Sequence, residues 1–190
     1  KVKNTLRFFT ECASKVRDSS NIIAIGITGS AGKTSLKEML GQSLSKIYKT
    51  TYSKKSYNNK YGVPLSLFNI EKKDKFGVFE LGMDKKGEID NLSKMIKPNI
   101  GVITNITYAH SKNFNNLFGI AKAKSEIIDN ILKNGSIVLN ADDKFYNYFK
   151  LKAKKRSLKI ISFSRKNKSN IKLEKIKSLK NISTLKIDIN

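Results

Sequence analysis

The sequence predicts an α/β protein in which a mostly parallel β-sheet is flanked by helices. Apolar, β-branched runs of strand length alternate with segments of helical periodicity along most of the chain, a pattern typical of parallel sheets. One such run, Ile22–Thr28, leads through a glycine-rich turn into a helical pattern that starts at Lys33. The chain has 190 residues, which is enough for one domain with a hydrophobic core.

The first half of the chain begins with a helix over Thr5–Val16, where apolar residues recur at helical spacing. A loop is expected over Ser56–Pro64, and Pro64 favours the start of a short helix over Leu65–Asn69. Pro98 ends the helix before it. The other expected elements are the strands Ile22–Thr28, Lys49–Ser53, Phe76–Leu81 and Ile100–Thr104 and the helices Lys33–Tyr48 and Gly87–Ile96.

The second half continues the alternation after a polar loop from Asn105 to about Asn116. The pattern predicts one long helix over Leu117–Leu132, which ends at Asn134-Gly135. The remaining elements are the strands Ser136–Leu139 and Leu158–Phe163, the helix Asp142–Lys152, and the terminal segments Ile171–Ile176 and Leu185–Ile189. These two terminal segments alternate in polarity, so we expect a terminal β-hairpin within residues 166–190.

The composition is strongly basic, with 38 Lys and Arg against 15 Asp and Glu and a formal net charge of +23. Such a charge attracts polyanions. The lysines are scattered, however, and no aromatic-interleaved basic motif of the kind that stacks bases is present. We therefore expect a solvated lysine surface that favours small anionic substrates, and no nucleic-acid partner.

Cysteine usage and hydropathy indicate a reducing, cytoplasmic setting. Cys12 is the only cysteine, which excludes an intrachain disulfide and a cysteine metal cluster. No apolar run approaches the ~20 residues that cross a bilayer, and no signal peptide is visible. We expect a monomer without a membrane segment.

The segment after the first expected strand has the residues of a phosphate-binding loop. Gly29 and Gly32 allow a tight turn that aims backbone N–H groups inward, and the helix that follows adds its positive N-terminal end. Lys33 would reach the β- and γ-phosphates, and the Thr34 hydroxyl would bind Mg²⁺. The alternative is an ordinary strand–turn–helix joint. The candidate nucleotide ligands are Thr28, Gly29, Ser30, Ala31, Gly32, Lys33 and Thr34.

Two further candidates follow expected strands, where parallel sheets bind their ligands. Glu80 stands at the end of an apolar strand and is a candidate Mg²⁺ ligand, the alternative being a surface or helix-capping glutamate. His110, the single histidine, is either a metal ligand or a structural or solvent-facing residue.

Polar residues in three other segments have roles that the residues alone leave open. Asn140 has both a donor and an acceptor for an adenine edge, and the alternative is that Asn140 and Asp142 cap the next helix. From composition alone, Lys124 is a solvated helix lysine. The pair Asn58 and Asn59 lies in what looks like a turn-rich loop.

Taken together, these segments resemble the central ATP-binding domain of the Mur ligases over about residues 20–165. His110 and Lys124 keep the interval that the family shows between its metal-binding histidine and its modified lysine. The matched segments are Thr28–Thr34, Asn58-Asn59 with Gly62 and Pro64, Glu80-Leu-Gly82 with Gly87-Glu-Ile89, Asn105–His110, Ala123–Ile127 and Asn140–Asp143. Within the family, the motifs are most similar to those of the members that join D-alanyl-D-alanine to UDP-N-acetylmuramoyl-tripeptide.

The resemblance implies an ATP-dependent ligase of peptidoglycan precursor synthesis that forms an amide bond through an acyl phosphate. It implies two Mg²⁺ sites, with Thr34 and Glu80 as ligands of one and His110 as a ligand of the other. Lys124 would be a metal ligand after carbamylation by CO₂, which replaces a cation by two oxygen atoms. The implied catalytic residues are Lys33, Lys124 and His110. Asn58 and Asn59 would lie on the muramoyl side and Asn140 near the adenine.

The resemblance also implies a domain organisation. The chain would be one central domain, with residues 1–20 as a linker helix from an N-terminal domain and with a further C-terminal domain; both flanking domains are absent from this sequence. Without them, we expect little or no ligation. The competing interpretations are another muramyl ligase, a folylpolyglutamate synthase or cyanophycin synthetase-like ligase, and a non-catalytic nucleotide-binding or basic nucleic-acid-binding module.

Overall fold

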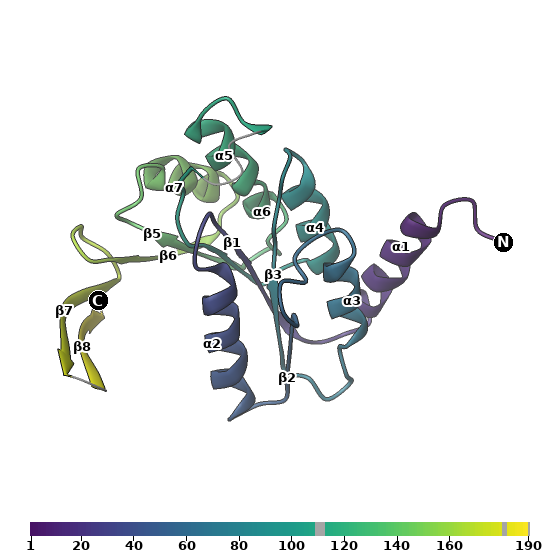
Figure 1. The fold of residues 1–190 in the computed structure, drawn as a ribbon, viewed down its shortest axis with the longest axis horizontal. Coiled ribbons are helices and arrows are strands. Elements are labelled where there is room, and N and C mark those ends of the chain that lie inside the picture. Colours follow the sequence, from purple (N-terminus) through teal and green to yellow (C-terminus); the bar gives the residue numbers. More distant parts are fainter. Residues whose placement is uncertain (109–112, 180–181, 190) are drawn as a thin grey trace.

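The computed structural model describes residues 1–108, 113–179 and 182–189, and these fold around an eight-stranded sheet (Figure 1). The strands are β1 (Ile23–Thr28), β2 (Thr50–Tyr52), β3 (Phe76–Glu80), β4 (Ile100–Ile103), β5 (Ser136–Asn140), β6 (Lys159–Ser164), β7 (Ile171–Leu179) and β8 (Ile182–Ile189). Their spatial order is β2-β3-β1-β4-β5-β6-β7-β8, and all neighbours are parallel except β7 and β8. The predicted fold class is confirmed.

Helices cover both faces of the sheet. Ile25 and Ile27 of β1 pack into a core under α2, whereas Ala24 faces the larger core on the opposite side, as the period of two along a strand requires. The helices are α1 (Thr5–Asp18), α2 (Lys33–Ser45), α3 (Gly62–Phe68), α4 (Glu88–Ile96), α5 (Leu117–Lys124), α6 (Glu126–Asp129) and α7 (Tyr146–Lys155). None of the helices in the described part of the chain is long and apolar enough to cross a membrane.

The strand order reverses beside β1, at the centre of the sheet. After β1 the chain passes through α2 toward the β2–β3 side, and after β3 it passes through α4 to β4 on the other side. Thr28 at the end of β1 is paired with Ile103 at the end of β4, so the segments that follow both strands emerge side by side. Ligands of open parallel sheets bind at such a reversal.

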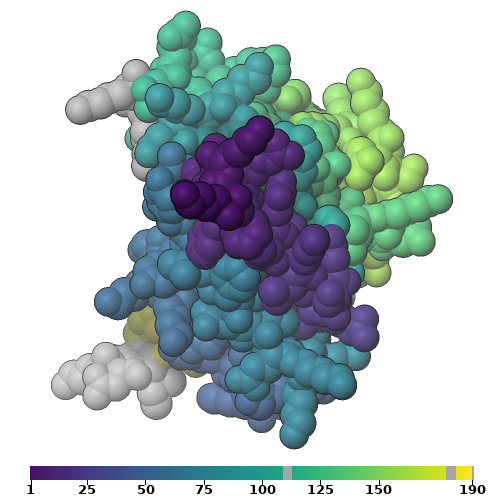
Figure 2. Space-filling view, turned by 90° about the vertical axis from the view of Figure 1, so that its right-hand side faces the viewer, coloured from purple at the N-terminus to yellow at the C-terminus, as the bar shows by residue number. Residues whose placement is uncertain are grey.

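The N-terminal helix α1 packs against the outside of α3 and α4, and Figure 2 shows it lying across that face. The buried guanidinium of Arg17 donates through Nε to the carbonyl of Ile96 at 2.6 Å and through Nη2 to that of Lys97 at 3.0 Å. These are carbonyls at the end of α4 that lack helical partners. The ring of Phe9 contacts that of Phe68, with centroids 5.3 Å apart. Arg17 therefore joins α1 to the rest of the chain.

The long helix predicted over Leu117–Leu132 is wrong, because the chain leaves the α-helical path at Ser125 and forms α5 and α6. The Ser125 hydroxyl donates to the carbonyl of Lys122 at 2.7 Å, and Lys152 donates to the carbonyl of Ser125 at 2.9 Å. Serine bonding to its own helix and a lysine from α7 both compete with the regular hydrogen-bond ladder. The break therefore depends in part on the contact with Lys152, which is distant in sequence and could not be predicted from this segment alone.

Two helix starts also differ from expectation. α3 begins at Gly62, inside the predicted loop, because Oδ1 of Asn59 accepts from the N–H groups of Tyr61 and Gly62 at 3.0 Å each. Pro64 is then in the first turn, where its missing N–H has no helical partner to lose. α7 begins at Tyr146 instead of Asp142, because residues 141–145 form turns.

The expected terminal hairpin is confirmed, with strands longer than predicted. β7 and β8 pair antiparallel along most of their length. Only two registered pairs, Phe163 with Ile171 and Ser164 with Lys172, join β7 to β6, so the hairpin extends away from the helical layers (Figure 1).

Candidate functional site

The glycine loop after β1 is built so tightly that one position tolerates only glycine. Gly29 has φ +144°, and a Cβ added there would lie 1.9 Å from Oγ1 of Thr104 in the segment after β4. Gly32 adopts φ +80° at the start of α2. Both glycines supply the left-handed backbone that the sequence pattern requires of them.

The loop is held against the segment that follows β4. The backbone N–H of Ser30 donates to the carbonyl of Asn105 at 2.9 Å, and that of Ala31 donates to Oδ1 of the same residue at 3.0 Å. Thr104 closes the contact by donating from Oγ1 to the carbonyl of Ala31 at 2.7 Å. Ser30 and Thr107 exchange two further hydrogen bonds. The reversal point of the sheet thus fixes the shape of the loop.

The start of α2 faces this loop with unused donors. The first-turn N–H groups of any helix have no partner within the helix. Here the N-cap residue is Gly32, and no side chain accepts from these groups as a cap. The ammonium of Lys33 reaches back to the carbonyl of Gly29 at 3.0 Å. A helix N-terminus and a lysine together can hold a phosphate group.

A hydroxyl and a carboxylate meet beside the loop. Oγ1 of Thr34 donates to Oε2 of Glu80 at 2.8 Å, and Nδ2 of Asn58 donates to Oε1 of the same carboxylate at 2.8 Å. Glu80 is 1% exposed, so the surface alternative is wrong. The structure brings Thr34 and Glu80 together, as the resemblance implies for one Mg²⁺ site, and adds Asn58, which the resemblance places on the muramoyl side.

Lys124 at the end of α5 is also buried, with 1% of its surface exposed, and the interpretation as a solvated helix lysine is wrong. Burial, with a smaller contribution from the nearby ammonium of Lys33, lowers the pKa of Lys124 to about 7. A large fraction of this amine is therefore uncharged near neutral pH. His110, its predicted partner, lies outside the described residues.

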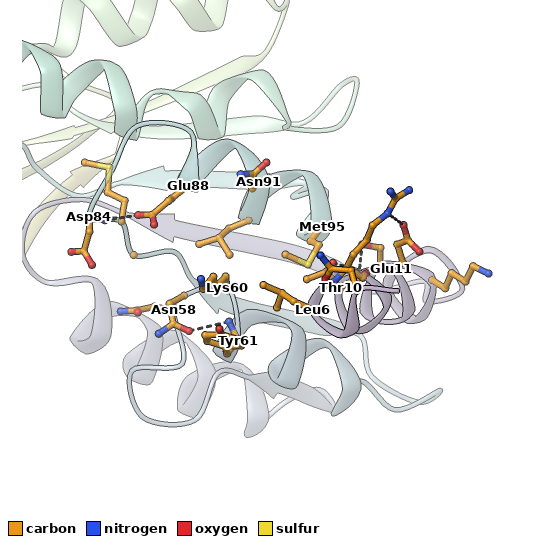
Figure 3. Close-up of a pocket in the computed structure, with 18 of the residues that line it drawn as sticks. Leu6, Thr10, Glu11, Asn58, Lys60, Tyr61, Asp84, Glu88, Asn91 and Met95 are labelled. Carbon is orange, nitrogen blue, oxygen red and sulfur yellow. Dashed lines mark hydrogen bonds and ion pairs between the residues drawn. The ribbon is translucent and has the colours of Figure 1, made fainter. Parts of the chain in front are cut away.

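A cavity of about 1140 Å³ opens next to the loop (Figure 3). Asn58, Lys60 and Tyr61 lie on one side, and Asp84, Glu88 and Asn91 lie on the other. Leu6, Thr10 and Glu11 of α1 close one end. Lys33 also lines the cavity, so the cavity and the glycine loop share a side chain.

The asparagine candidates have structural contacts of their own. Asn59 lines the cavity and starts α3. Oδ1 of Asn140 accepts from the N–H of Asp142 at 3.0 Å, and the Asp142 carboxylate accepts from the N–H groups of residues 165–167. Neither side chain caps α7, so the helix-cap alternative is wrong.

Sequence reasoning left three supporting side chains out of the candidate set. Asn105 orders the loop, as described above. Asp143 accepts from the N–H of Ile106 at 2.7 Å and so fixes the same segment. The carboxylate of Glu126, two residues after Lys124, accepts from the N–H groups of Gly87 and Asp90 at the start of α4. All three lie in segments that resemble the family, and this is the signal by which the sequence could have identified them. Their hydrogen-bond partners are distant in sequence, so the contacts themselves could not be predicted.

The order of these segments along the chain matches a known family. A family model described as the Mur ligase middle domain matches residues 27–189, from the end of β1 through the terminal hairpin. The chain belongs to the Mur ligase middle-domain family. The predicted resemblance is therefore confirmed.

Two curated relatives of this Mur ligase middle domain share one name. The UDP-N-acetylmuramoyl-tripeptide–D-alanyl-D-alanine ligase of Buchnera aphidicola subsp. Baizongia pistaciae is 41% identical over 170 residues, which cover 90% of this chain and 36% of that protein. The Escherichia coli ligase of the same name is 37% identical over 142 residues, covering 75% and 31%. A MurF crystal structure from Acinetobacter baumannii matches with TM-score 0.92 and 33% identity, covering 99% and 41%. The chain thus spans 31–41% of the length of these relatives.

The donor set of this Mur ligase middle domain fits a magnesium–nucleotide complex. Within residues 1–108, 113–179 and 182–189, no three histidine, cysteine or acidic side chains gather into a metal cluster. Thr34 and Glu80 offer hard oxygen ligands beside the loop. Mg²⁺ bound with nucleotide usually takes one or two protein oxygens, together with phosphates and water.

Proposed function

We propose that this chain binds ATP and Mg²⁺ in a ligase that joins D-alanyl-D-alanine to UDP-N-acetylmuramoyl-tripeptide, an amide-forming step of peptidoglycan precursor synthesis. The observation that carries the proposal is the contact between Thr34 and Glu80 at the mouth of the glycine loop. It joins a hard-metal donor pair to a phosphate-binding loop. The name shared by relatives at 41% and 37% identity supports the acceptor and donor substrates.

Different residues of the chain have different proposed roles in phosphoryl transfer. The first-turn N–H groups of α2 and the Lys33 ammonium would hold the phosphates and stabilise charge that develops on the γ-phosphate as it moves to the tripeptide carboxylate. Thr34 and Glu80 would hold a magnesium ion, which would supply positive charge beside the phosphates. The resulting acyl phosphate is attacked by the amine of D-alanyl-D-alanine, with release of phosphate.

Lys124 is proposed to act after carbamylation. Its uncharged amine attacks CO₂ to form an N–C bond, and one proton leaves, which converts a neutral side chain into a carbamate anion. A pKa of about 7 makes the amine available for this reaction near neutral pH. The carbamate oxygens and the proposed ligand His110 would hold a second magnesium ion, which would stabilise negative charge on the acyl phosphate.

The muramoyl substrate is proposed to enter the 1140 Å³ cavity, because Lys33 lines it beside the loop. Asn58 and Asn59 lie along its wall and are the proposed contacts on this side. Asn140, at the end of β5 on the same edge of the sheet, is the proposed adenine contact.

A panel assay tests the substrate assignment. The full-length protein is given ATP, Mg²⁺ and UDP-N-acetylmuramoyl-tripeptide, and phosphate release is followed with D-alanyl-D-alanine, single D- and L-amino acids, or glutamate as the amine. We expect release with D-alanyl-D-alanine. Equal or greater release with a single amino acid or glutamate would instead support a sister ligase. ATP-independent, salt-sensitive binding to DNA of any sequence, without ligation, would favour a basic binding module.

A separate measurement tests the carbamate. The full-length protein is equilibrated with ¹³C-enriched CO₂, and a protein-bound carbamate carbon is sought by NMR. We expect a carbamate signal that is lost in Lys124→Met and kept in Lys122→Met, which changes an exposed lysine of the same helix. A signal that survives Lys124→Met, or none in the unmodified protein, contradicts carbamylation of Lys124.

A further inference from the structure

Lys37 is a completely buried lysine in the second turn of α2, one turn after Thr34. Its side chain is 0% exposed. Its ammonium donates to Oε1 of Glu38 at 2.6 Å, to the carbonyl of Ser53 at 2.7 Å and to the carbonyl of Lys55 at 2.7 Å. No sequence motif singles out this residue.

Two of these three acceptors belong to the backbone that joins β2 to α3. A buried ammonium is costly unless it is paired and hydrogen-bonded, so its partners are held firmly in place. Ser53 is itself 0% exposed. Lys55 adopts φ +48°, a left-handed conformation that is uncommon for a lysine. The ammonium of Lys37 therefore compensates for, and fixes, an otherwise unfavourable bend in this segment.

The same segment places Asn58 next to Glu80, which with Thr34 forms the proposed magnesium-binding pair. The side chain of Asn58 donates to Oε1 of Glu80, and the backbone carbonyl of Asn58 accepts from the N–H of Gly82 at 2.7 Å. Oε2 of Glu80 accepts from Thr34, three residues before Lys37 on α2. These contacts therefore link Lys37 through the bend to Asn58 and Glu80, and Glu80 contacts Thr34 on the same helix as Lys37.

We propose that Lys37 is a positioning residue for magnesium binding. It orders residues 53–58 so that Asn58 holds one oxygen of Glu80 and leaves the other directed at Thr34. This inference rests on the proposed function, since it assumes that Thr34 and Glu80 bind the ion. Lys37 itself does not touch the nucleotide or the metal.

The test uses the full-length protein with Lys37→Met, which removes the donors at similar side-chain length. Lys46→Met is the matched control, because Lys46 is the C-cap of α2 and is exposed. Two quantities are measured. One is hydrogen exchange of the amides of residues 53–60 without nucleotide or metal. The other is the gain in ADP affinity that Mg²⁺ produces, from calorimetric titrations with and without Mg²⁺.

For Lys37→Met we expect at least tenfold faster exchange in residues 53–60, ADP affinity without Mg²⁺ within twofold of the unmodified protein, and a magnesium-dependent gain reduced at least tenfold. Lys46→Met should match the unmodified protein in all three. A purely structural role would weaken ADP binding equally with and without Mg²⁺, and that result overturns the proposal. An unchanged gain in Lys37→Met overturns it as well.

Two outcomes separate this inference from the proposed function. If the unmodified protein shows no magnesium-dependent ADP binding, the proposed function fails and the inference fails with it. If it does bind and Lys37→Met binds identically, the inference alone fails. If exchange rises throughout Lys37→Met because it does not fold, Lys37→Gln, with a shorter neutral amide, decides by the same criteria.

Discussion

The hydroxyl of Thr34 and the carboxylate of Glu80 are 2.8 Å apart, although they belong to different elements, the first turn of α2 and the end of β3. The parallel pairing of β1 with β3 creates this contact, since Ile27 at the end of β1 is in register with Glu80. The loop after β1 then returns α2 over the end of β3. Two oxygen atoms that can bind a metal ion thus lie beside the loop that can hold a phosphate.

Replacing Glu80 by Gln should strongly reduce magnesium-dependent catalysis while leaving the fold intact. The amide keeps the size and one acceptor oxygen but loses the negative charge, so we expect kcat to fall by about 10²-fold, as for loss of one charge-stabilising group. Thr34→Ser, which keeps the hydroxyl, should stay within a few-fold. The measurement is phosphate release by the full-length protein over a range of Mg²⁺ concentrations. Activity of Glu80→Gln with unchanged magnesium dependence would exclude Glu80 as a ligand.

Gly29→Ala should abolish nucleotide binding. The added Cβ would lie 1.9 Å from Oγ1 of Thr104, and alanine rarely adopts φ +144°, so the loop must open. Gly87→Ala is the matched control, because Gly87 has φ +88° but no atom within 4 Å of an added Cβ. It should cost about 1–2 kcal/mol of stability and keep binding. ADP titration of each variant decides; normal binding by Gly29→Ala would contradict the tight loop.

Lys124 should impose a pH dependence on stability in CO₂-free buffer. Its pKa is about 7 when folded and near 10.5 when unfolded, so between these values the unfolded state binds more protons. The free energy of unfolding should therefore rise with pH across this window, by up to about 1.4 kcal/mol per unit, relative to Lys124→Met. Below pH 7 both states are protonated and the contribution is constant.

Urea unfolding of the chain at several pH values measures this difference. Lys122→Met should follow the unmodified chain, since Lys122 is exposed on the same helix. Parallel curves for the unmodified chain and Lys124→Met would mean that the ammonium is not destabilised by burial.

Arg17→Met should release α1 from the end of α4. The carbonyls of Ile96 and Lys97 would lose charged donors, which costs about 1–3 kcal/mol when buried acceptors remain unpaired. Arg7→Met removes the exposed pair with Glu11 on the same helix and should lower the unfolding free energy much less than Arg17→Met does. Unfolding free energies and hydrogen exchange within α1 measure both effects. Equal costs for the two variants would show that Arg17 does not anchor the helix.

The sheet and the glycine loop could be predicted because their signals are local. The apolar runs at Ile22–Thr28 and Phe76–Leu81 have the length and alternation of strands, and Gly29 and Gly32 stand where the backbone must turn. The helix predicted through Ser125 failed for the opposite reason. Its break depends on Lys152, which reaches across from α7, and periodicity within one segment carries no information about that contact.

The burial of individual side chains also depends on long-range contacts and could not be predicted from local sequence. By composition Lys124 is a surface lysine, and Lys37 carried no signal at all, yet the structure encloses both. What the sequence by itself determined was the set of elements and the chemistry at the strand ends, since backbone preferences and short motifs act over a few residues. Only the tertiary structure decided which of those groups meet and which lose their water, because pairing of distant strands and helices sets desolvation and long-range contacts.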